Sequence, residues 1–487
     1  MLLRWFISIL LLCLLINIVY GDYIGAVVEY NPLEGPTPET TIEENLKNYI
    51  FHIEQAKVFG VQIIVFPEYG LTTFADNPEN YSVAIPDVGT TNFLNESFVL
   101  LKLCNAALEH EMYVVANLYE KSNITDGTLT YNTNVVFSSN GSLVAKHRKM
   151  NLYHEPKITP GNETTIFKTT FGTFGVITCA DIIYYNPSQT VLENTGVTDV
   201  IFPTAWTSEF PFYMALSIQH GYALANKVNL LAANLNDPSM ALGSSSIISS
   251  DGIVLRRILT DTASNNIAYA NLKRPGSATR NLELMGFNIF QKESRQPLSN
   301  FKNLTDFWYD DFLYKPISLS AENITEEICD GNFCCNFEVI PAKGQTNTSE
   351  VYKLVAYQGP ITYDSATVPI KICALLGCVN DDIASCGVWP PTAYSTVFRQ
   401  ITVWGNWEAE SGLFVRPVNI RGNWEPSYNV TYLENKTNET VGVSFNTTQP
   451  IDDLVSFGLY VTGSGEFRHP WSWAVLIMIS LKFVKYF

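Results

Sequence analysis

The sequence is poor in charge, and in positive charge above all. Charged residues make up 16% of its 487 residues, and 30 Lys and Arg against 47 Asp and Glu give a formal net charge of −17 at pH 7. The basic residues form no stripe, so the composition argues against a nucleic acid or an anionic lipid surface as a partner. Hydrophobic residues reach 46%, too many for a disordered chain, and the length allows about two to four folded domains.

The sequence also lacks internal repeats. It lacks the motifs of two kinds of site that use cysteine: a zinc site and the active site of a papain-like peptidase. There is no Cys-x-x-Cys pair of the kind that holds zinc. There is no C-G-[SA]-C-[WY] block, and no motif marks a histidine as the partner of a thiol, which disfavours a papain-like cysteine peptidase. We therefore predict neither a metal nor an organic cofactor. The oligomeric state is left open by the sequence.

Cysteine is scarce except in the C-terminal third. Of nine cysteines, Cys13 lies in an N-terminal apolar run, and Cys104 and Cys179 stand alone. The remaining six lie close together in the chain: Cys329, Cys334, Cys335, Cys373, Cys378 and Cys386. In an oxidising compartment such a cluster is most simply three disulfides, with pairings that the sequence leaves open, and a zinc site is the alternative. Cys104 and Cys179 are then expected to be free thiols.

Both ends of the chain carry apolar runs. Residues 1–21, MLLRWFISILLLCLLINIVYG, have one charge at Arg4 and small residues before Asp22, which predicts a cleaved signal peptide rather than a membrane anchor. Residues 463–487 begin with Gly-Ser-Gly and end in a short apolar tail, interrupted by Lys482 and Lys485. This segment resembles a glycosylphosphatidylinositol attachment signal, which is removed when the lipid is attached. An ordinary buried terminal segment is the alternative.

N-x-[ST] sequons are dense and support an extracellular location, secreted or anchored at the cell surface. Their asparagines are Asn80, Asn95, Asn123, Asn140, Asn162, Asn303, Asn323, Asn347, Asn429, Asn435, Asn438 and Asn446. Which of them carry glycans cannot be read from the sequence.

Strand-like and helical patterns alternate over residues 22–290. A helix is expected after a capping box of Thr41 and Glu44, with Gly60 closing it, and hairpins are expected to turn at residues 140–141 and 251–252. Such alternation predicts a layered α/β domain. Short β-type runs over residues 300–455 predict a second, smaller β-rich domain.

Three residues with reactive side chains follow predicted strands. Glu68 lies in IIVFPEYG just after the strand-like run, Lys149 follows the hairpin in VAKHRKMNLY, and Cys179 ends FGVITC. Reactive groups of layered α/β domains gather at strand ends. Each residue alone also has a purely structural interpretation. Glu68 could be a solvated residue at a strand end, Lys149 a surface charge and Cys179 a thiol of the core.

Together, VFPEYG, HRKMNLYHE and FGVITCADI resemble the three blocks of the nitrilase-like carbon–nitrogen hydrolases, in the same chain order. EYNP at 29–32, PTAW at 203–206, VNLLAANL at 228–235 and DGNFCC at 330–335 are similar to the biotinidase and vanin (pantetheinase) branch. The resemblance covers nearly the whole chain after residue 21. It implies a nitrilase-like α/β fold, a four-layer α-β-β-α sandwich, followed by a smaller β-rich domain with disulfides.

The resemblance also implies roles for these side chains. Cys179 would be the nucleophile, Glu68 the general base, and Lys149 the proton donor that stabilises the oxyanion. Glu155 would support Lys149 or the substrate, with a plain surface carboxylate as the alternative. His220 is expected to pack within a helix rather than to act as an acid or base.

The implied activity is hydrolysis of a small linear amide through a thioester, with pantetheine as the favoured substrate and pantothenate and cysteamine as products. Biotinyl amides are the alternative substrate, and an inactive secreted glycoprotein is the alternative function. Ala180 and GSSSI at 243–247 depart from the branch, where a bulky aromatic and GSGI are usual. Both departures bear on which amide is cleaved.

Overall fold

The computed structural model describes residues 22–125, 127–193, 196–273, 303, 311–363 and 366–463. The predicted signal peptide lies outside these residues, as does nearly all of the predicted lipid-attachment signal. Among the helices within these ranges, none has the length and apolar character needed to cross a membrane.

The first domain contains two six-stranded mixed sheets. The first sheet has the order β12-β1-β2-β3-β4-β5, and the second has the order β11-β10-β9-β8-β7-β6. The first sheet comprises β1 (Tyr23–Glu29), β2 (Ile63–Val65), β3 (Tyr113–Ile124), β4 (Gly127–Phe137), β5 (Leu143–Arg148) and β12 (Asn266–Leu272). The second comprises β6 (Thr165–Lys168), β7 (Thr173–Val176), β8 (Asp199–Thr204), β9 (Asn229–Asn234), β10 (Ser245–Ile248) and β11 (Val254–Ile258). Each sheet has three parallel strands, β1-β2-β3 or β7-β8-β9, flanked by antiparallel ones.

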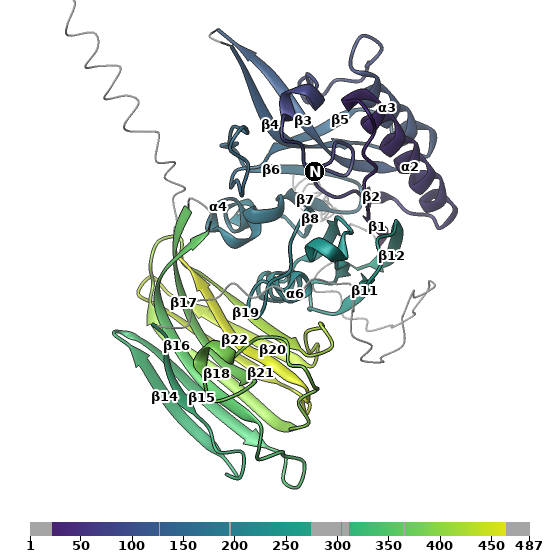
Figure 1. Ribbon diagram of the computed structural model, residues 1–487. Coiled ribbons are helices and arrows are strands. Elements are labelled where there is room, and N and C mark those ends of the chain that lie inside the picture. Colours follow the sequence, from purple (N-terminus) through teal and green to yellow (C-terminus); the bar gives the residue numbers. More distant parts are fainter. Residues whose placement is uncertain are drawn as a thin grey trace, which may run out of the picture.

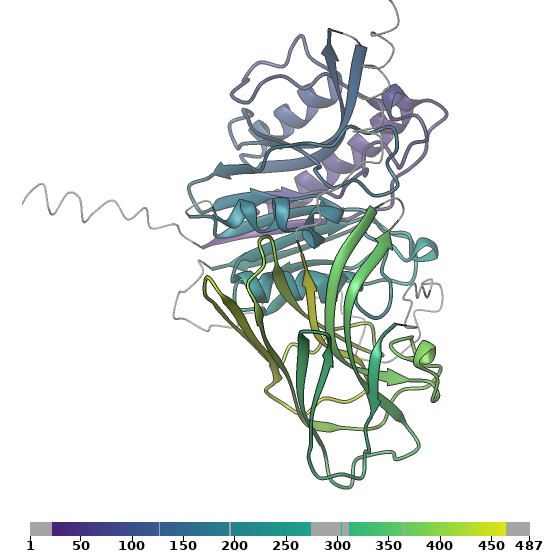
Figure 2. The same cartoon turned by 90° about the vertical axis from the view of Figure 1, so that its left-hand side faces the viewer.

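The two sheets pack face to face and carry helices on their outer faces (Figures 1 and 2). Val27, Val115 and Ile201 belong to the apolar cluster between the sheets. Two helices, α2 (Pro38–Val58) and α3 (Phe98–Glu109), cover the first sheet. The second sheet is covered by α6 (Ala215–Asn226) with the short α4 (Tyr185–Ser188) and α5 (Thr190–Glu193). The predicted four-layer α-β-β-α sandwich is thus confirmed.

Helix α2 begins earlier than expected. Its N-cap is Thr37, whose side chain accepts a hydrogen bond from the backbone of Thr40, and Pro38 occupies the first turn. The predicted capping box of Thr41 and Glu44 is therefore wrong, because Pro38 is compatible with the start of a helix and Thr37 supplies the cap one turn earlier. Gly60 follows the helix with a φ of +71°, as its predicted closing role requires.

The second domain is an antiparallel β-sandwich. Its sheets have the orders β13-β16-β17-β22-β19 and β14-β15-β18-β21-β20. The strands are β13 (Leu313–Pro316), β14 (Ile324–Asp330), β15 (Phe333–Pro341), β16 (Val351–Tyr363), β17 (Ala366–Cys378), β18 (Phe398–Glu408), β19 (Phe414–Arg421), β20 (Val430–Lys436), β21 (Thr440–Thr447) and β22 (Leu454–Thr462). The strand β22 pairs on both sides and runs past the predicted end of the domain at residue 455.

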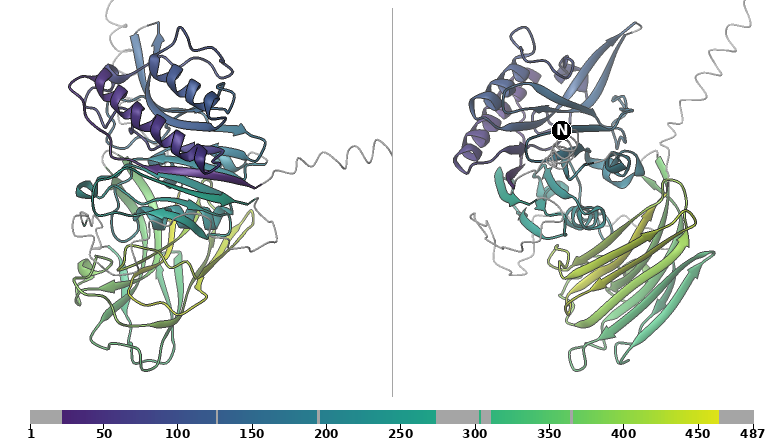
Figure 3. Two further views of the ribbon diagram at one scale, coloured as in Figure 1. Left: turned by 90° about the vertical axis from the view of Figure 1, so that its right-hand side faces the viewer. Right: turned by 180° about the vertical axis from the view of Figure 1, so that it is seen from behind.

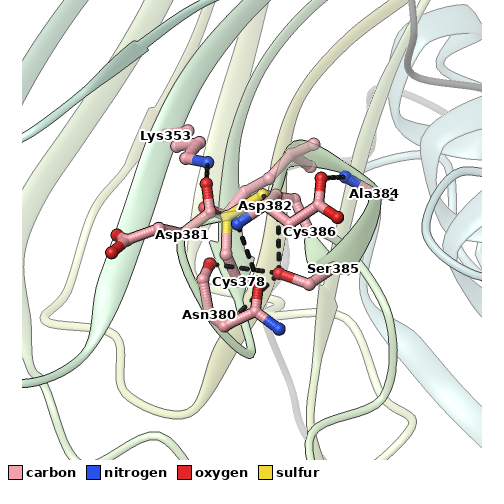
Figure 4. Close-up of a disulfide and its surroundings, with 9 residues drawn as sticks. Lys353, Cys378, Asn380, Asp381, Asp382, Ala384, Ser385 and Cys386 are labelled. Carbon is pink, nitrogen blue, oxygen red and sulfur yellow. Dashed lines mark hydrogen bonds between the residues drawn. A yellow bond between two sulfur atoms is a disulfide. The ribbon is translucent and has the colours of Figure 1, made fainter.

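All six clustered cysteines form disulfides, in the pairs Cys329–Cys334, Cys335–Cys373 and Cys378–Cys386. The second pair joins β15 to β17, and therefore one sheet of the sandwich to the other. The third closes the turn after β17, where Lys353 Nζ donates to the backbone carbonyl of Asp381 (Figure 4). Cys104 and Cys179 are free, as predicted.

The two domains share helix α6, which lies between the second sheet of the first domain and the β22-β19 side of the sandwich (Figures 1 and 3). Every residue from Ala215 to Ala223 is buried, as expected for a helix covered on both sides. A Cβ atom at Gly221 would lie 2.1 Å from the Pro417 carbonyl oxygen, so the close approach of α6 to β19 requires glycine there. Ser217 Oγ accepts a 3.1 Å hydrogen bond from the Asn419 amide.

The sequon asparagines lie on the surface. Eleven of the twelve are exposed, and Asn446 is half-buried. The accessible positions leave all eleven available for glycosylation, which itself stays a prediction.

Candidate active site

The three residues singled out in the sequence lie together at one end of the two sheets. Glu68 follows β2, Lys149 follows β5 and Cys179 follows β7, and all three side chains are buried. Lys149 Nζ lies 2.8 Å from Glu68 Oε1 and 2.6 Å from Glu155 Oε2. The ammonium therefore bridges two carboxylates inside the protein.

Glu155 was expected to support Lys149, and the structure places it in direct contact. Its carboxylate also accepts hydrogen bonds from the Tyr69 hydroxyl, from Asn132 Nδ2 at 2.9 Å and from the Tyr153 amide at 3.1 Å. Four donors thus hold one buried carboxylate, so its position is fixed. A plain surface carboxylate is excluded.

Asn132, on β4, is a site residue that the motifs did not reveal. Its Nδ2 donates to Glu68 Oε1 at 2.7 Å as well as to Glu155. Asn117 Nδ2 in turn donates to Asn132 Oδ1 at 2.7 Å, and Asn117 Oδ1 accepts from the Tyr69 amide at 2.9 Å. The available signal was the two asparagines at 132 and 134 within a strand, because asparagine is rare in strands and buried amides need specific partners.

Cys179 opens a short 3-10 turn, η2 (Cys179–Ile183), directly after the segment that extends β7. Its φ is +45°, in the left-handed region that non-glycine residues rarely adopt. Backbone strain of this kind concentrates at functional sites. Here it presents Sγ to the cavity, 4.0 Å from the Ala205 carbonyl oxygen.

Asp181, two residues after the thiol, ties its turn to the lysine loop. Its Oδ1 accepts from the Asn151 amide at 2.8 Å and from the Met150 amide at 3.2 Å. Its Oδ2 accepts from the Thr178 amide at 3.0 Å and lies 3.2 Å from His147 Nε2. One buried carboxylate thus fixes the relative positions of Lys149 and Cys179.

The thiol is neutral at rest. Burial raises the pKa of Cys179 to about 12, and the nearby Glu68 carboxylate adds to the rise, whereas Lys149 opposes it. The thiol therefore needs a base before it can react as a nucleophile. Glu68 is placed for this, because its Oε2 accepts a 2.9 Å hydrogen bond from the same Ala205 whose carbonyl faces Sγ.

The neighbouring charges suit proton transfer. Burial raises the pKa of Glu68, the Lys149 ammonium lowers it, and the negative charge of Glu155 raises it further. For Lys149, burial alone would lower the pKa, but the ionised form of Cys179 and the two carboxylates raise it well above the usual value. Glu68 is thus a stronger base than an exposed glutamate, and Lys149 stays cationic.

A cavity of about 550 Å³, including its open mouth, leads to the thiol. Its lining is mostly apolar or aromatic: Tyr153, Cys179, Ala180, Ile183, Tyr184, Ala205, Trp206, Thr207, Glu209 and Tyr213. A concave apolar site with a few polar groups is typical for a small organic ligand. Ala180 borders the cavity directly beside Cys179 and contributes only a methyl group.

Two other candidate residues lie elsewhere. Cys104 is on α3, beneath the turn at Gly141. His220 is buried on α6 against Tyr428 of the second domain, and burial lowers its pKa to about 4, which agrees with a packing role.

Comparisons with known proteins agree with this arrangement. The carbon–nitrogen hydrolase model matches residues 26–279, and the vanin C-terminal domain model matches residues 301–464. The chain is 29% identical to Vanin-like protein 1 of Drosophila melanogaster, over 94% of this chain and 90% of the relative.

Vertebrate relatives are of similar identity. The chain is 30% identical to Biotinidase of Bos taurus, over 79% of this chain and 82% of the relative. It is 29% identical to Pantetheinase of Homo sapiens, over 71% and 70%. The first-domain match covers more than half of the chain, and the second domain matches the vanin model, so the protein belongs to the carbon–nitrogen hydrolase family, in its biotinidase and vanin branch.

Proposed function

We propose that this carbon–nitrogen hydrolase cleaves pantetheine to pantothenate and cysteamine, with Cys179 as nucleophile, Glu68 as general base and Lys149 as the cation at the developing oxyanion. The observation that carries the assignment of roles is the placement of Lys149 Nζ between Glu68 and Glu155, next to a neutral buried thiol. Relatives named Pantetheinase support the choice of substrate.

In the first half-reaction, Glu68 takes the proton of Cys179, and the sulfur forms a bond to the amide carbonyl carbon. The carbonyl oxygen gains the negative charge, which the Lys149 ammonium stabilises; one such contact is typically worth about 3 kcal/mol. The C–N bond then breaks as the nitrogen takes a proton from Lys149, and Glu68 replaces that proton across the 2.8 Å contact. The amine leaves, and the acyl group remains on sulfur as a thioester.

In the second half-reaction, the Glu68 carboxylate takes a proton from water, and the resulting hydroxide attacks the thioester carbon. The C–S bond breaks as Glu68 returns the proton to sulfur, and the carboxylic acid leaves. The groups that transfer protons are linked to the cavity by hydrogen bonds, because Glu68 accepts from Ala205 of the lining and Lys149 donates to Glu68. The cycle uses only side chains of this protein and water.

The lining of the cavity supports a substrate with an extended acyl chain that carries both apolar and polar groups. Aromatic walls at Tyr184, Trp206 and Tyr213 can pack against methylene and methyl groups, and Ala180 leaves space beside the thiol for the acyl carbon. Biotinyl amides fit the same description and are the second candidate, because the relatives include Biotinidase.

Measurement of cysteamine release from pantetheine by the purified protein tests the proposal. Wild type should release cysteamine, and Cys179→Ala should reduce the rate by at least about 10³-fold because no thioester can form. Cys104→Ala removes the second free thiol of the described residues, which lies on α3 away from the cavity, and should keep the activity within about twofold. Release of biotin from biotinyl-lysine, without cysteamine release, would transfer the assignment to biotinyl amides. No release from either amide would contradict the proposal.

We also propose that the protein works outside the cell, secreted or lipid-anchored. Three disulfides and eleven exposed sequon asparagines support an oxidising, glycosylating route. Expression of the full chain in secretory cells, with protein measured in medium and on the cell surface before and after phospholipase treatment, tests both halves of this proposal. Retention inside the cell would contradict it.

A further inference from the structure

One wall of the cavity is a single segment, residues 206–213, which connects β8 to α6. Trp206, Thr207, Glu209 and Tyr213 all line the cavity. The segment folds back on itself, because Trp206 Nε1 donates to the Tyr213 carbonyl at 2.7 Å and the Tyr213 amide donates to the Glu209 carbonyl at 3.0 Å. Displacement of Tyr213 would therefore move the whole wall.

Behind this wall stands Tyr460 of β22, from the second domain. Its hydroxyl is hydrogen-bonded to the hydroxyl of Tyr213, 247 residues away in the chain, and the two ring centroids lie 5.5 Å apart. The Tyr460 ring also lies 6.0 Å from that of Phe212. Nearby, Ser456 Oγ donates to the Pro211 carbonyl at 3.3 Å, which adds a second attachment of β22 to the wall.

Tyr460 is itself held firmly. It is 1% exposed, and the guanidinium carbon of Arg416 on β19 lies 5.2 Å from its ring centroid. The strand β22 is buried on both faces and paired on both edges. The hydroxyl of Tyr460 therefore has a fixed position, and its hydrogen bond to Tyr213 can hold residues 206–213 in place.

We propose that Tyr460 is a positioning residue for substrate binding, which makes the second domain a structural part of the substrate pocket. The inference rests on the proposed amidase function for its kinetic readout, but its structural readout is independent of any substrate. Cys179, Glu68 and Lys149 belong to other segments, so loss of the Tyr460 hydroxyl should affect how substrate is held and leave the reactivity of the thiol unchanged.

The structural experiment compares hydrogen exchange in wild type and Tyr460→Phe, which keeps the ring and removes the hydroxyl. Loss of one buried hydrogen bond corresponds to about a fivefold change in an equilibrium. Backbone amides in residues 206–213 should exchange about fivefold faster, while those of β9 should not change. Tyr432→Phe is the matched control, because Tyr432 is also a buried tyrosine of the second domain and its hydroxyl bonds to Glu434, away from the cavity lining.

The kinetic experiment measures KM and kcat for pantetheine together with the rate of Cys179 alkylation by iodoacetamide. Tyr460→Phe should raise KM about fivefold, with kcat and the alkylation rate within about twofold. Tyr213→Phe should have the same effect, and the double variant should be no worse than either single one, because both remove the same bond. Tyr432→Phe should match wild type.

Unchanged exchange in residues 206–213 would overturn the inference, as would additive effects of the two single variants. An alkylation rate that changes together with KM would also overturn it, because a general loss of structure would then account for both. If wild type releases no cysteamine, the proposed substrate is wrong, and the exchange experiment alone decides on Tyr460.

Discussion

Two buried carboxylates share the Lys149 ammonium, yet they contact different parts of the site. Glu68 lies next to Ala205 and the thiol, whereas Glu155 is surrounded by donors that hold it in place. In the proposed mechanism Glu68 gains and loses protons, and Glu155 takes no part in proton transfer. Two glutamates thus have different roles in this mechanism because their surroundings differ.

This difference predicts a shift in the pH dependence of the reaction. The carboxylate form of Glu68 must be present, and its raised pKa means that kcat/KM falls on acidification at a pH above the ordinary glutamate range. Glu155→Gln removes a negative charge that raises the pKa of Glu68, so the acidic limb should move to lower pH, while kcat/KM on the plateau drops about 10- to 100-fold as Lys149 loses a partner. Rates of cysteamine release from pH 4 to 9 measure both effects. An acidic limb at the same pH in both proteins would contradict the assignment.

For single residues, the sequence pointed to the three side chains that the structure brings together, but not to their environment. Glu68, Lys149 and Cys179 stand in recognisable blocks, and Asp181 lies beside the thiol. Asn132 does not stand in such a block. It belongs to the site only through its hydrogen bonds to Glu68 and Glu155, which are 64 and 23 residues away in the chain. The raised pKa of Cys179 could not be predicted from the neighbouring residues in the sequence either, since it depends on how completely the other segments bury the sulfur.

Among the elements, the turns were the most predictable. Asn140-Gly141 and Asp251-Gly252 do connect antiparallel strands, with φ of +81° at Gly141 and +79° at Gly252, because these residues accept left-handed backbone at low cost. The predicted N-cap of α2, Thr41, lies four residues after the observed N-cap, Thr37, because the sequence has a threonine suited to capping at both positions. Burial of β22 on both faces could be expected from its mostly apolar sequence, LVSFGLYVT, but which layer covers it could not.

The strand β1 ends in a buried carboxylate that links it to β10 and to the loop after β9. Glu29 Oε1 accepts from Asn236 Nδ2 at 2.6 Å, and Oε2 accepts from the Ser245 amide at 2.6 Å. Burial raises the pKa of Glu29 to about 7, although these hydrogen bonds lower it. The folded state therefore binds this proton more tightly than the unfolded chain does.

We expect this group to reduce stability as the pH rises. Its contribution is fully present below the unfolded pKa of about 4.5 and is lost as the pH passes through about 7, a change of about 3 kcal/mol. Urea denaturation at pH 5 and pH 8 should show a smaller pH difference for Glu29→Gln than for wild type. Glu54→Gln, at an exposed position of α2, should keep the wild-type difference. Equal pH differences in all three proteins would contradict the role of Glu29.

For the whole molecule, the change of sequence texture near residue 300 predicted a second β-rich domain, and the disulfides were expected there. The docking of that domain on α6 was not predictable, because its contacts join residues about 200 positions apart, such as Ser217 with Asn419. Gly221 alone could not predict the close approach of β19, since a glycine within a helical pattern can equally mark the end of the helix.

The disulfide between the two sheets should contribute more to stability than the one within a hairpin. Cys335 and Cys373 are 38 residues apart, whereas Cys329 and Cys334 are 5 apart. From the loop lengths alone, Cys335→Ala/Cys373→Ala should lose about 4 kcal/mol and Cys329→Ala/Cys334→Ala about 2 kcal/mol. Urea midpoints of the two double variants, measured side by side, check the order. Equal losses, or a larger loss for the hairpin pair, would contradict it.

The neutral state of Cys179 has a consequence for the lifetime of the protein. Oxidants and disulfides react with thiolates, and a buried thiol with a pKa of about 12 has a minute thiolate fraction at neutral pH. In the proposed mechanism, Glu68 takes the proton of this thiol at the first step, so the thiolate is only a small fraction of the resting protein. In surroundings that favour disulfides, a thiol kept neutral in this way resists both sulfenic acid formation and exchange with small disulfides.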